Sequence, residues 1–568
     1  MDAHARPAQL TRREVMAVSA AAIGIASVAS AQTGPNEVQE AGPVASGTVF
    51  EDTDGSGQHS PASKGLPGIM VSNGRDVVTT GADGTWALPV RDGDSVFVIK
   101  PTGWMTPVDP VTQLPRFATV FTLSGTPADL GFRFAGLPPS PLPESIDFPL
   151  RRQEEKSTFS AILFTDPQPE SLAEIGYIRD DVVAATSGRV AAFGITHGDL
   201  MFDDLAHYDR YNRIIGTVGL PWYNACGNHD MNLEAPDNTH SRDTFKRVFG
   251  ARHYAFQYGG VTFFVLDNVD YGGTDPSKPN GLGTYRGYFD GGQLAFIRNV
   301  LATVPQDSLV AYSFHIPLRT LAGSEPNNVT TNTREFLGAI SSHSNSVSFS
   351  GHTHTNEHWY FGPAEGFGGG THHHHVLTAV SGSWWSGPFD DRGIPVALAT
   401  DGTPNGFHLL DIDEKSYRTT LLPAKEPGCA SMRIVLDTQL HGDAPEVMRD
   451  YHAGTILRGP IEQAAAASTR VVVNVFDGGP RTRVEMAVGR NGPFAPMQKI
   501  ERIDPFVAEV YARNVATKKP WVRPGLSSHI WQATLPGALP PGTHRVAVRA
   551  IDDYGREQVG WMVLEVTA

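Results

Sequence analysis

Five short segments in the middle of this 568-residue chain carry the residue types that hold paired metal ions. Each segment follows a β-branched or aromatic run that is typical of a buried strand, and stretches with helical spacing separate the runs. Because the ends of such strands meet at one edge of a sheet, we expect the five segments to form one site there. In chain order they are Thr165-Asp166-Pro167-Gln168, Gly198-Asp199, Gly227-Asn228-His229-Asp230, His315-Ile316-Pro317 and Gly351-His352-Thr353-His354.

The donors in these segments mix oxygen and imidazole ligands: two aspartates, one asparagine, one glutamine and three histidines. Divalent metals of intermediate hardness accept such a mixture. Two ions side by side need one bridging carboxylate, and together they activate a water and neutralise phosphoryl oxygens during in-line displacement. The segments therefore predict metal-assisted hydrolysis of a phosphoester.

The order of the blocks resembles the calcineurin-like metallophosphoesterase family, whose pattern runs Asp-x-His, Gly-Asp, Gly-Asn-His-Asp/Glu, His and Gly-His-x-His. The resemblance spans residues 166–354 and implies a central α/β domain with the four-layer (α/β/β/α) sandwich of that family. It also implies two divalent metal ions, manganese, iron or zinc, bridged by Asp199. The implied ligands of the first metal are Asp166, Gln168 and His354, and those of the second are Asn228, His315 and His352.

The same resemblance implies roles for the third block. His229 is expected to be the general acid, or a donor to the transition-state oxygens, and Asp230 is expected to orient the His229 ring. The glycines that precede Asp199, Asn228 and His352 are expected to let the backbone turn sharply where strand becomes loop.

Gln168 departs from the family pattern, which usually has histidine at this position. A neutral amide oxygen is a weaker ligand than imidazole for iron or zinc. It suits manganese or magnesium, or it leaves the first metal position weak and partly hydrated. The identity of the metal and the filling of both positions therefore stay open.

Other polar residues near the blocks have more ordinary interpretations. His197 lies within a strand, where a hydrogen-bonded core histidine is the expected state. Asp203 and Asp204 precede a helical stretch, so we expect N-capping. For His358, a place at the rim of the site stays open.

The loop between Gly366 and Gly406 is unusual, because it contains four consecutive histidines, two tryptophans and many glycines. One hypothesis makes it a substrate-recognition loop, with aromatic surface from Trp384 and Trp385 and a cationic contact from Arg392. The alternative is a glycine-rich loop that packs both tryptophans against the C-terminal domain. The sequence favours neither.

Composition changes along the chain predict a multidomain protein in which two β-sandwich-like domains flank the catalytic domain. The N-terminal module resembles carboxypeptidase-regulatory and collagen-adhesin B modules, and the C-terminal domain resembles immunoglobulin or fibronectin-like sandwiches. Asp52 and Asp54 begin a calcium-loop pattern without its closing glutamate, so a turn stabilised by aspartate side chains is the favoured interpretation. The predicted boundaries are 1–31 for a signal peptide, 44–136 for the N-terminal module, 157–405 for the catalytic domain and 406–568 for the C-terminal domain.

Residues 1–31 have the features of an export signal. Arg12-Arg13 precede the apolar stretch Ala17–Val28, and Ala29-Ser30-Ala31 fits a small-residue cleavage site. The paired arginines resemble a twin-arginine signal, with an ordinary signal peptide as the alternative. A retained membrane anchor is disfavoured, because the apolar run is too short to span a bilayer. We therefore expect a periplasmic or secreted protein.

Net charge limits the classes of binding partner, and the positions of the cysteines indicate their redox state. A net charge of −15 disfavours nucleic acid and anionic membranes, so the expected partner is a small phosphorylated substrate. Cys226 lies in an apolar run just before the third block, so a buried free thiol is favoured over a bridge to Cys429. The oligomeric state is open.

The leading hypothesis is an exported, binuclear-metal-dependent phosphoesterase that hydrolyses a phosphomonoester, phosphodiester or diphosphate bond with a metal-activated water. The alternative from another class is a non-catalytic exported protein that binds glycans or surfaces on the same scaffold. A third hypothesis is a 5′-nucleotidase or UDP-sugar diphosphatase. It is disfavoured, because the C-terminal domains of those enzymes resemble an aromatic-clamped nucleotide-binding fold, and the C-terminal part of this sequence shows no sign of that fold.

Overall fold

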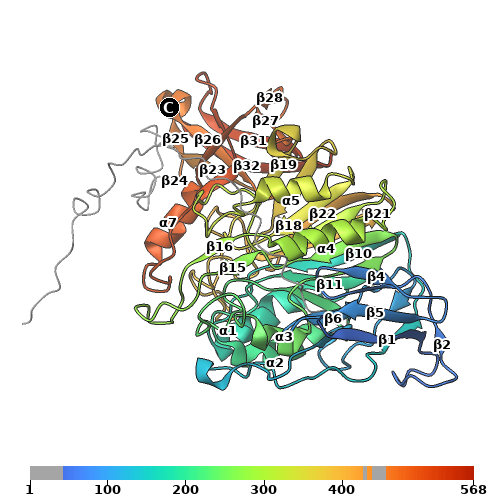
Figure 1. Ribbon diagram of the computed structural model, residues 1–568. Coiled ribbons are helices and arrows are strands. Elements are labelled where there is room, and N and C mark those ends of the chain that lie inside the picture. Colours follow the sequence, from blue (N-terminus) through green and yellow to red (C-terminus); the bar gives the residue numbers. More distant parts are fainter. Residues whose placement is uncertain (1–41, 426–430, 438–455) are drawn as a thin grey trace, which may run out of the picture. The chain divides into compact units, whose positions relative to one another are not determined.

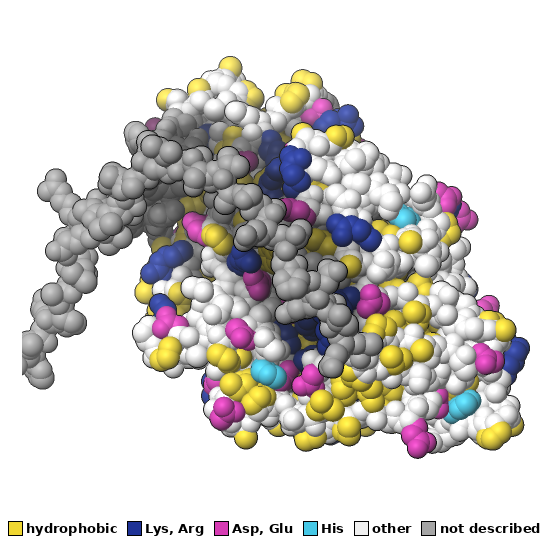
Figure 2. All heavy atoms as spheres, in the orientation of Figure 1, with side chains coloured by type: hydrophobic (Ala, Val, Ile, Leu, Met, Phe, Trp, Pro, Cys, Tyr) yellow, Lys and Arg dark blue, Asp and Glu magenta, His cyan; other side chains and the backbone are white. Residues whose placement is uncertain are grey.

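The computed structural model describes residues 42–425, 431–437 and 456–568 (Figure 1). The predicted export segment 1–31 and Cys429 lie outside the described residues. Among those residues, no helix is long and apolar enough to span a bilayer. Acidic and basic side chains are interspersed on the face shown in Figure 2.

The N-terminal module consists of short strands in two sheets. Alternation builds them: in Thr85–Pro89, Trp86 and Leu88 are buried and their neighbours are exposed. One sheet has the order β2-β1-β9-β7, with β5 also paired to β1, and the other has the order β4-β3-β6-β8. The strands are β1 (Val44–Glu51), β2 (Lys64–Gly65), β3 (Met70–Ser72), β4 (Val77–Thr79), β5 (Thr85–Pro89), β6 (Ser95–Val98), β7 (Trp104–Met105), β8 (Ala118–Val120) and β9 (Phe148–Arg152), with the 3-10 turn η1 (Ala128–Leu130).

Two details of this module bear on the sequence predictions. The side chain of Asp52 accepts a hydrogen bond from the backbone of Gly57, and that of Asp54 accepts one from Ser56, which is the turn stabilised by aspartates. Strand β9 lies beyond the boundary predicted at residue 136 and pairs in parallel with β1.

The central part contains two mixed sheets. The first has the order β12-β11-β10-β21-β22 and the second β13-β14-β17-β18-β20-β19. In the first, β10, β11 and β12 run parallel, and in the second β14, β17, β18 and β20 do. The strands are β10 (Thr158–Phe164), β11 (Phe193–His197), β12 (Trp222–Ala225), β13 (Tyr254–Tyr258), β14 (Val261–Val265), β17 (Val310–Ser313), β18 (Ser346–Ser350), β19 (Glu357–Phe361), β20 (His372–Val376), β21 (Gly406–Asp413) and β22 (Ser416–Pro423), with the small ribbon β15 (Val269–Tyr271) and β16 (Tyr285–Gly287).

Successive residues of these strands face opposite cores. Phe263 of β14 meets Phe193 of the other sheet with ring centroids 5.1 Å apart, whereas Phe264 meets Phe296 of α4 at 5.8 Å. Helices α4 and α5 contact each other and lie side by side in Figure 1. The helices and turns are α1 (Leu172–Tyr177), the π-helical turn η2 (Ile178–Val183), η3 (Leu205–His207), α2 (Tyr208–Gly216), α3 (Asp243–Phe249), α4 (Gly291–Leu301), α5 (Thr333–Ile340) and η4 (Pro363–Glu365).

Two features of the central sheets differ from the sequence predictions. The first sheet extends past the boundary predicted at residue 405, because β21 pairs with β10 and β22 pairs with β21. Strand β20 lies within the stretch from Gly366 to Gly406 that was expected to be a loop, and four of its five residues are buried histidines. Histidine is not a typical strand residue, so the strand was not recognised.

The C-terminal part pairs two further sheets, ordered β24-β23-β26-β30-β29 and β25-β32-β31-β27-β28. Valines of β26 and β31 share one buried cluster between them with Trp531 of β30. The elements are β23 (Met432–Asp437), β24 (Ile456–Leu457), β25 (Ile461–Glu462), η5 (Gln463–Ser468), β26 (Arg470–Val475), β27 (Arg483–Val488), β28 (Ala495–Pro496), β29 (Gln498–Ile503), α7 (Pro505–Arg513), β30 (Leu526–Thr534), β31 (Gly542–Ile551) and β32 (Glu557–Thr567).

Candidate metal centre

The five predicted segments come together where strands of the two central sheets end. β10, β11 and β12 of the first sheet lead into the segments with Asp166, Asp199 and Asn228. β17 and β18 of the second sheet lead into those with His315 and His352. Most of these side chains are buried, whereas His352 is partly exposed, so the site is a polar cluster that reaches the surface at His352.

Four of the predicted ligands surround one point. Nε2 of His315 lies 3.1 Å from Oδ2 of Asp199 and 3.0 Å from Oδ1 of Asn228. Nδ1 of His352 lies 3.1 Å from the same His315 nitrogen. Neighbouring ligands of a divalent metal with bonds of about 2.0 to 2.2 Å stand roughly this far apart. The set Asp199, Asn228, His315 and His352 therefore fits one metal ion.

The remaining predicted ligands form a second group around Asp166 and Asp199. Gln168 Nε2 bonds to Asp199 Oδ2 and lies 3.5 Å from Asp166 Oδ1, and His354 Nε2 lies 3.8 Å from that oxygen. Two buried atoms in this group, Gln168 Oε1 and His354 Nε2, have no hydrogen-bond partner. Buried polar atoms are rarely left this way, so both fit ligation of a cation.

All three histidines are fixed by a backbone carbonyl on their outer nitrogen. His315 Nδ1 donates to the carbonyl of His197 at 2.9 Å, and His352 Nε2 donates to that of Asn327 at 2.8 Å. His354 Nδ1 donates to the carbonyl of Gly382. Each bond fixes the orientation of the ring and turns its other nitrogen into the site, which is the usual arrangement of metal-binding histidines.

The backbone of the ligand loops is strained. Asp166, Gln168, Asp199, His352 and His354 all have positive φ angles, between 36° and 75°. A non-glycine residue in this region costs on the order of 1 kcal/mol or more, and such residues cluster at functional sites. The loops therefore hold these side chains in place at the expense of local backbone stability.

The glycines of the metal-binding segments are needed for two different reasons. Only one of these, a sharp backbone turn, was expected from the sequence. Gly198 has φ +90°, so there the turn itself requires glycine. Gly227 and Gly351 do not adopt positive φ, but an added Cβ would lie 2.1 Å from Asp199 Oδ1 and 2.2 Å from Asp166 Oδ2, respectively. These two glycines are needed because the loops approach the carboxylates closely.

The His229 ring is oriented by Asp203, not by Asp230. Its Nδ1 lies 2.8 Å from Asp203 Oδ1, and the ring stacks on Phe202 with centroids 4.5 Å apart. Asp203 was expected to be an N-cap, but only Asp204 caps the following turn, accepting from Ala206 N. The two aspartates are adjacent, and only their positions in the folded loop separate the roles.

Asp230 instead organises the loops beneath the site. Its carboxylate accepts hydrogen bonds from the backbone of Gly227, Leu200 and Met201 and from the Tyr208 hydroxyl. It thereby joins the loop after β11 to the loop after β12. The expected contact with the His229 ring is replaced by this structural one.

The electrostatics of the site favour bound cations. Burial lowers the pKa of His315, but Asp199 and Asp166 more than offset this and raise it to about 9. Burial likewise lowers the pKa of His229, but Asp199 and Asp203 raise it to about 9. Two buried carboxylates thus hold protons on neighbouring imidazoles, and metal cations would take the place of part of that positive charge.

Two other sequence expectations are met near the site. His197 is a hydrogen-bonded core histidine, with Nδ1 2.8 Å from the carbonyl of Phe164 and Nε2 3.1 Å from Ser313 Oγ. Burial lowers its pKa to about 4, so it is neutral. Cys226 is a buried free thiol.

Comparison with known families identifies the parts of the chain on either side of the ligands. One model, the N terminal of calcineurin-like phosphoesterase, matches residues 53–136, and a second, the C terminal of calcineurin-like phosphoesterase, matches residues 374–557. Residues 53–136 and 374–557 are therefore similar to the N-terminal and C-terminal domains of calcineurin-like phosphoesterases. The ligands from Asp166 to His354 lie between the two matches, so their assignment rests on the geometry above.

Comparisons with curated proteins and with solved structures do not assign further residues. No curated protein matches the chain. Among solved structures, the chain is similar to the purple acid phosphatase PPD1 from yellow lupin (Lupinus luteus) seeds, with 12% identity over 64% of this chain and 68% of that one, at a TM-score of 0.34. A TM-score of this size assigns no residues.

The match to the calcineurin-like C-terminal model includes the loop with Trp384 and Trp385. In the structure, the residues of this loop have different surroundings. Trp384 stacks on His354 with centroids 3.9 Å apart and packs against α7 residues. Trp385 is only 3% exposed and donates to the carbonyl of Pro167 at 3.0 Å. Arg392 is bound by Asp181 and Asp390. Trp384 thus packs against the C-terminal domain and also lies beside His354, whereas Trp385 is buried in the central domain and Arg392 is held in ion pairs.

An aromatic surface missed by sequence analysis extends from the site. Phe202 stacks on His229 and also on Trp521 of the C-terminal domain, with the second pair of centroids 6.1 Å apart. Trp521 is 48% exposed, and the ammonium of Lys519 lies over its ring, 5.8 Å from the centroid. The only sequence signal was a lone tryptophan in a proline-rich stretch, remote from every motif.

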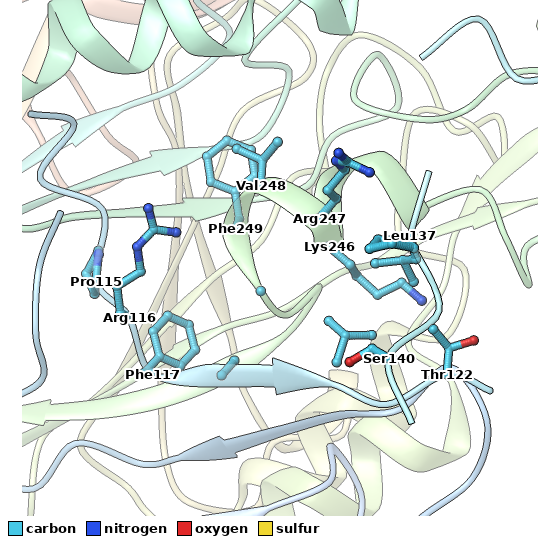
Figure 3. A pocket seen from close by; sticks show the side chains of 14 residues that line it. Pro115, Arg116, Phe117, Thr122, Leu137, Ser140, Lys246, Arg247, Val248 and Phe249 are labelled. Atoms are coloured by element: carbon cyan, nitrogen blue, oxygen red, sulfur yellow. The ribbon is translucent and has the colours of Figure 1, made fainter. Parts of the chain in front are cut away.

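A cavity of about 400 Å³ lies elsewhere, between the N-terminal module and α3, and none of the metal-centre residues line it (Figure 3). Its basic side chains already have partners: Arg116 pairs with Asp109, Lys246 with Asp243, and Arg247 donates to a backbone carbonyl. We therefore assign the chemistry to the strand-end cluster.

Proposed function

We propose that this chain is an exported metal-dependent phosphoesterase that uses two divalent ions. One observation carries the proposal: His315, His352 and His354 each bond a backbone carbonyl with one nitrogen and direct the other toward Asp166 or Asp199. Such a set of prepared ligands has no purpose in a core without a cation. The family of the flanking domains supports the same reaction class.

The residues would hold the ions as two groups that share Asp199. Asp166, Gln168 and His354 would complete one position, and Asn228, His315 and His352 the other. Manganese, iron or zinc bound there would supply an activated water and positive charge against the phosphoryl oxygens. The amide oxygen of Gln168 weakens the first position and favours a harder ion there.

The chain's own residues would handle the leaving group. His229 lies beside Asp199, with its backbone N–H 2.9 Å from Oδ1, and its side chain is partly exposed. Held by Asp203, it would donate a proton from Nε2 to the leaving oxygen. Trp384 and the Phe202–Trp521 stack would border the part of the substrate that does not react.

We further propose the four-layer (α/β/β/α) core of this family, with sandwich-like flanks. The inter-sheet contact of Phe193 with Phe263 and the helix contact of Phe264 with Phe296 support that layering. A diester or diphosphate bond is slightly favoured over a monoester, because aromatic rings contact both His354 and His229.

The test uses chelator-treated protein restored with Mn²⁺, Zn²⁺, Fe²⁺ or Ca²⁺ and assayed on bis-p-nitrophenyl phosphate and p-nitrophenyl phosphate. We expect metal-dependent release of nitrophenol, abolished in Asp199→Asn and retained in His59→Asn, a change at an exposed histidine. Folded protein that is inactive with every metal would refute the proposal.

The alternative, a non-catalytic protein that binds glycans or surfaces, predicts no bound metal at the strand-end cluster. Elemental analysis of the wild type and Asp199→Asn therefore separates the two. Export is tested separately, by fusing residues 1–31 to a reporter enzyme. We expect periplasmic activity that is lost when Arg12 and Arg13 are both replaced by lysine.

A further inference from the structure

The four histidines of β20 point alternately to its two sides, as in any strand. His372 and His374 turn toward the serines of β18: His372 contacts Ser346 and Ser348, each at 2.8 Å. His373 and His375 turn the other way, toward β19 and the C-terminal domain. The first pair is satisfied by hydroxyls, and the second pair enters a different kind of cluster.

That cluster converges on a single oxygen, Oδ1 of Asp477, in the turn after β26. Nε2 of His358 lies 3.2 Å from it, Nε2 of His375 3.3 Å and Nε2 of His408 3.7 Å. The side-chain amide of Asn356 lies 3.1 Å from the same atom. The three histidines come from β19, β20 and β21 and are almost fully buried, with side-chain exposures of 1%, 0% and 0%.

Hydrogen bonding alone does not account for this arrangement. A carboxylate oxygen has two lone pairs, and those of Oδ1 are taken by His358 Nε2 at 3.2 Å and the Asn356 amide at 3.1 Å, while His375 Nε2 also contacts Asn356 Oδ1 at 2.8 Å. His408 is left out: neither of its ring nitrogens has a hydrogen-bond partner, although the ring is fully buried. An unpartnered buried imidazole aimed at a carboxylate is costly unless something between them satisfies both.

The outer nitrogens of the other two histidines are already held. His358 Nδ1 lies 2.9 Å from His373 Nε2, and that ring in turn contacts the Tyr417 hydroxyl. His375 Nδ1 lies 3.3 Å from Thr419 Oγ1. Such partners fix the orientation of metal-binding histidines and direct their inner nitrogen to the ion.

We infer that His358, His375, His408 and Asp477, the interdomain histidine cluster, bind a divalent transition metal ion of the zinc type. Tetrahedral bonds of about 2.0 to 2.2 Å separate neighbouring ligands by about 3.4 Å. The three imidazole nitrogens lie 3.2, 3.3 and 3.7 Å from Asp477 Oδ1, and the ligand atoms of His358, His375 and Asp477 lie within 4.8 Å of one another. Three imidazoles and one carboxylate fill four positions and leave none for water. The site is therefore structural, and it shares no residue with the proposed active centre.

A metal here would connect parts of the chain far apart in sequence. His358, His375 and His408 belong to the two central sheets, whereas Asp477 belongs to the C-terminal domain. The ion would fasten that domain against the core, and the same domain carries Trp521 to the active centre. Metal removal would then loosen both the domain contact and the aromatic surface.

The experiment separates this site from the active centre by using full-length Asp199→Asn, in which the proposed catalytic pair is disrupted. Chelator-treated protein is titrated with Co²⁺ and followed by its visible absorption, which is intense for tetrahedral sites. We expect one tetrahedral equivalent per chain. Adding His358→Asn and His408→Asn should remove it, whereas adding His372→Asn, on the same strand but outside the cluster, should retain it.

Stability gives a second measurement that does not depend on the spectrum. Zn²⁺ should raise the Tm of Asp199→Asn and leave the Tm of the cluster variant unchanged, with far-ultraviolet circular dichroism confirming that the variant is folded. The inference is overturned if Asp199→Asn binds no tetrahedral Co²⁺, or if the folded cluster variant binds it equally well. Neither result depends on phosphoesterase activity.

Discussion

His372 should make this protein sensitive to mild acid. The ring is fully buried, both nitrogens are bonded to serine hydroxyls, and burial lowers its pKa from 6.5 to about 3. The depressed pKa means that the stability contribution is complete above pH 6.5 and is lost as the pH falls toward 3, because only the unfolded chain takes up the proton. Linkage with these two values gives a loss of about 2 kcal/mol between pH 7 and pH 5 from this residue alone.

The assay compares wild type with His372→Asn, which does not titrate in this range, by chemical denaturation at both pH values. Any fixed cost of losing the ring appears at both and cancels in the double difference. We expect the stability difference between the two proteins to shrink by about 2 kcal/mol at pH 5. Exposed His59→Asn serves as the control.

A double difference near zero would refute the reasoning. It would mean that the folded protein binds the proton at His372, so that the serines of β18 and the surrounding rings accommodate an imidazolium.

Asp203→Asn should lower kcat by about 10- to 1,000-fold with little change in KM, because it removes the charge that holds the proposed general acid. Asp204→Asn should leave kcat unchanged. Equal effects of the two variants in steady-state assays would contradict the role assigned to Asp203. Gly227→Ala should lose bound metal, because the added Cβ would lie 2.1 Å from Asp199 Oδ1. Gly338→Ala, whose added Cβ would have no atom within 4 Å, should keep its metal. Elemental analysis of the two variants measures the metal content. Metal at about 1,000 times its Kd should stabilise the folded protein by about 4 kcal/mol, read as a Tm increase that chelator reverses; an unchanged Tm would contradict a preformed site.

The metal ligands could be found from the sequence, because strand periodicity fixes where each strand ends and each end carries a ligand residue. Their neighbours could not. Whether Asp203 or Asp230 meets the His229 ring depends on the conformation of two loops, and both aspartates look alike in sequence. Asp203 resembled an N-cap because it precedes a helical turn.

Contacts between strands far apart in the chain could not be predicted from the sequence either. β21 and β22 look like the start of a β-rich domain, and only their hydrogen bonds to β10 place them in the central sheet. The histidines of β20 have low strand propensity, and their partners His408 and Asp477 lie far along the chain. Spacing within a sequence cannot indicate such a cluster, because it is assembled from three strands and a distant turn.

The pairing of β10 with β21 also affects the order in which the protein can be made. β10 is synthesised early, but its antiparallel neighbour begins at Gly406, after every proposed active-centre ligand has been translated. Until then one side of a buried, apolar strand is an open edge, which is prone to pair with other chains. Closing so long a loop is intrinsically slow. Nascent or truncated chains that end before residue 406 should therefore depend on chaperones and aggregate, although they contain the complete set of catalytic residues.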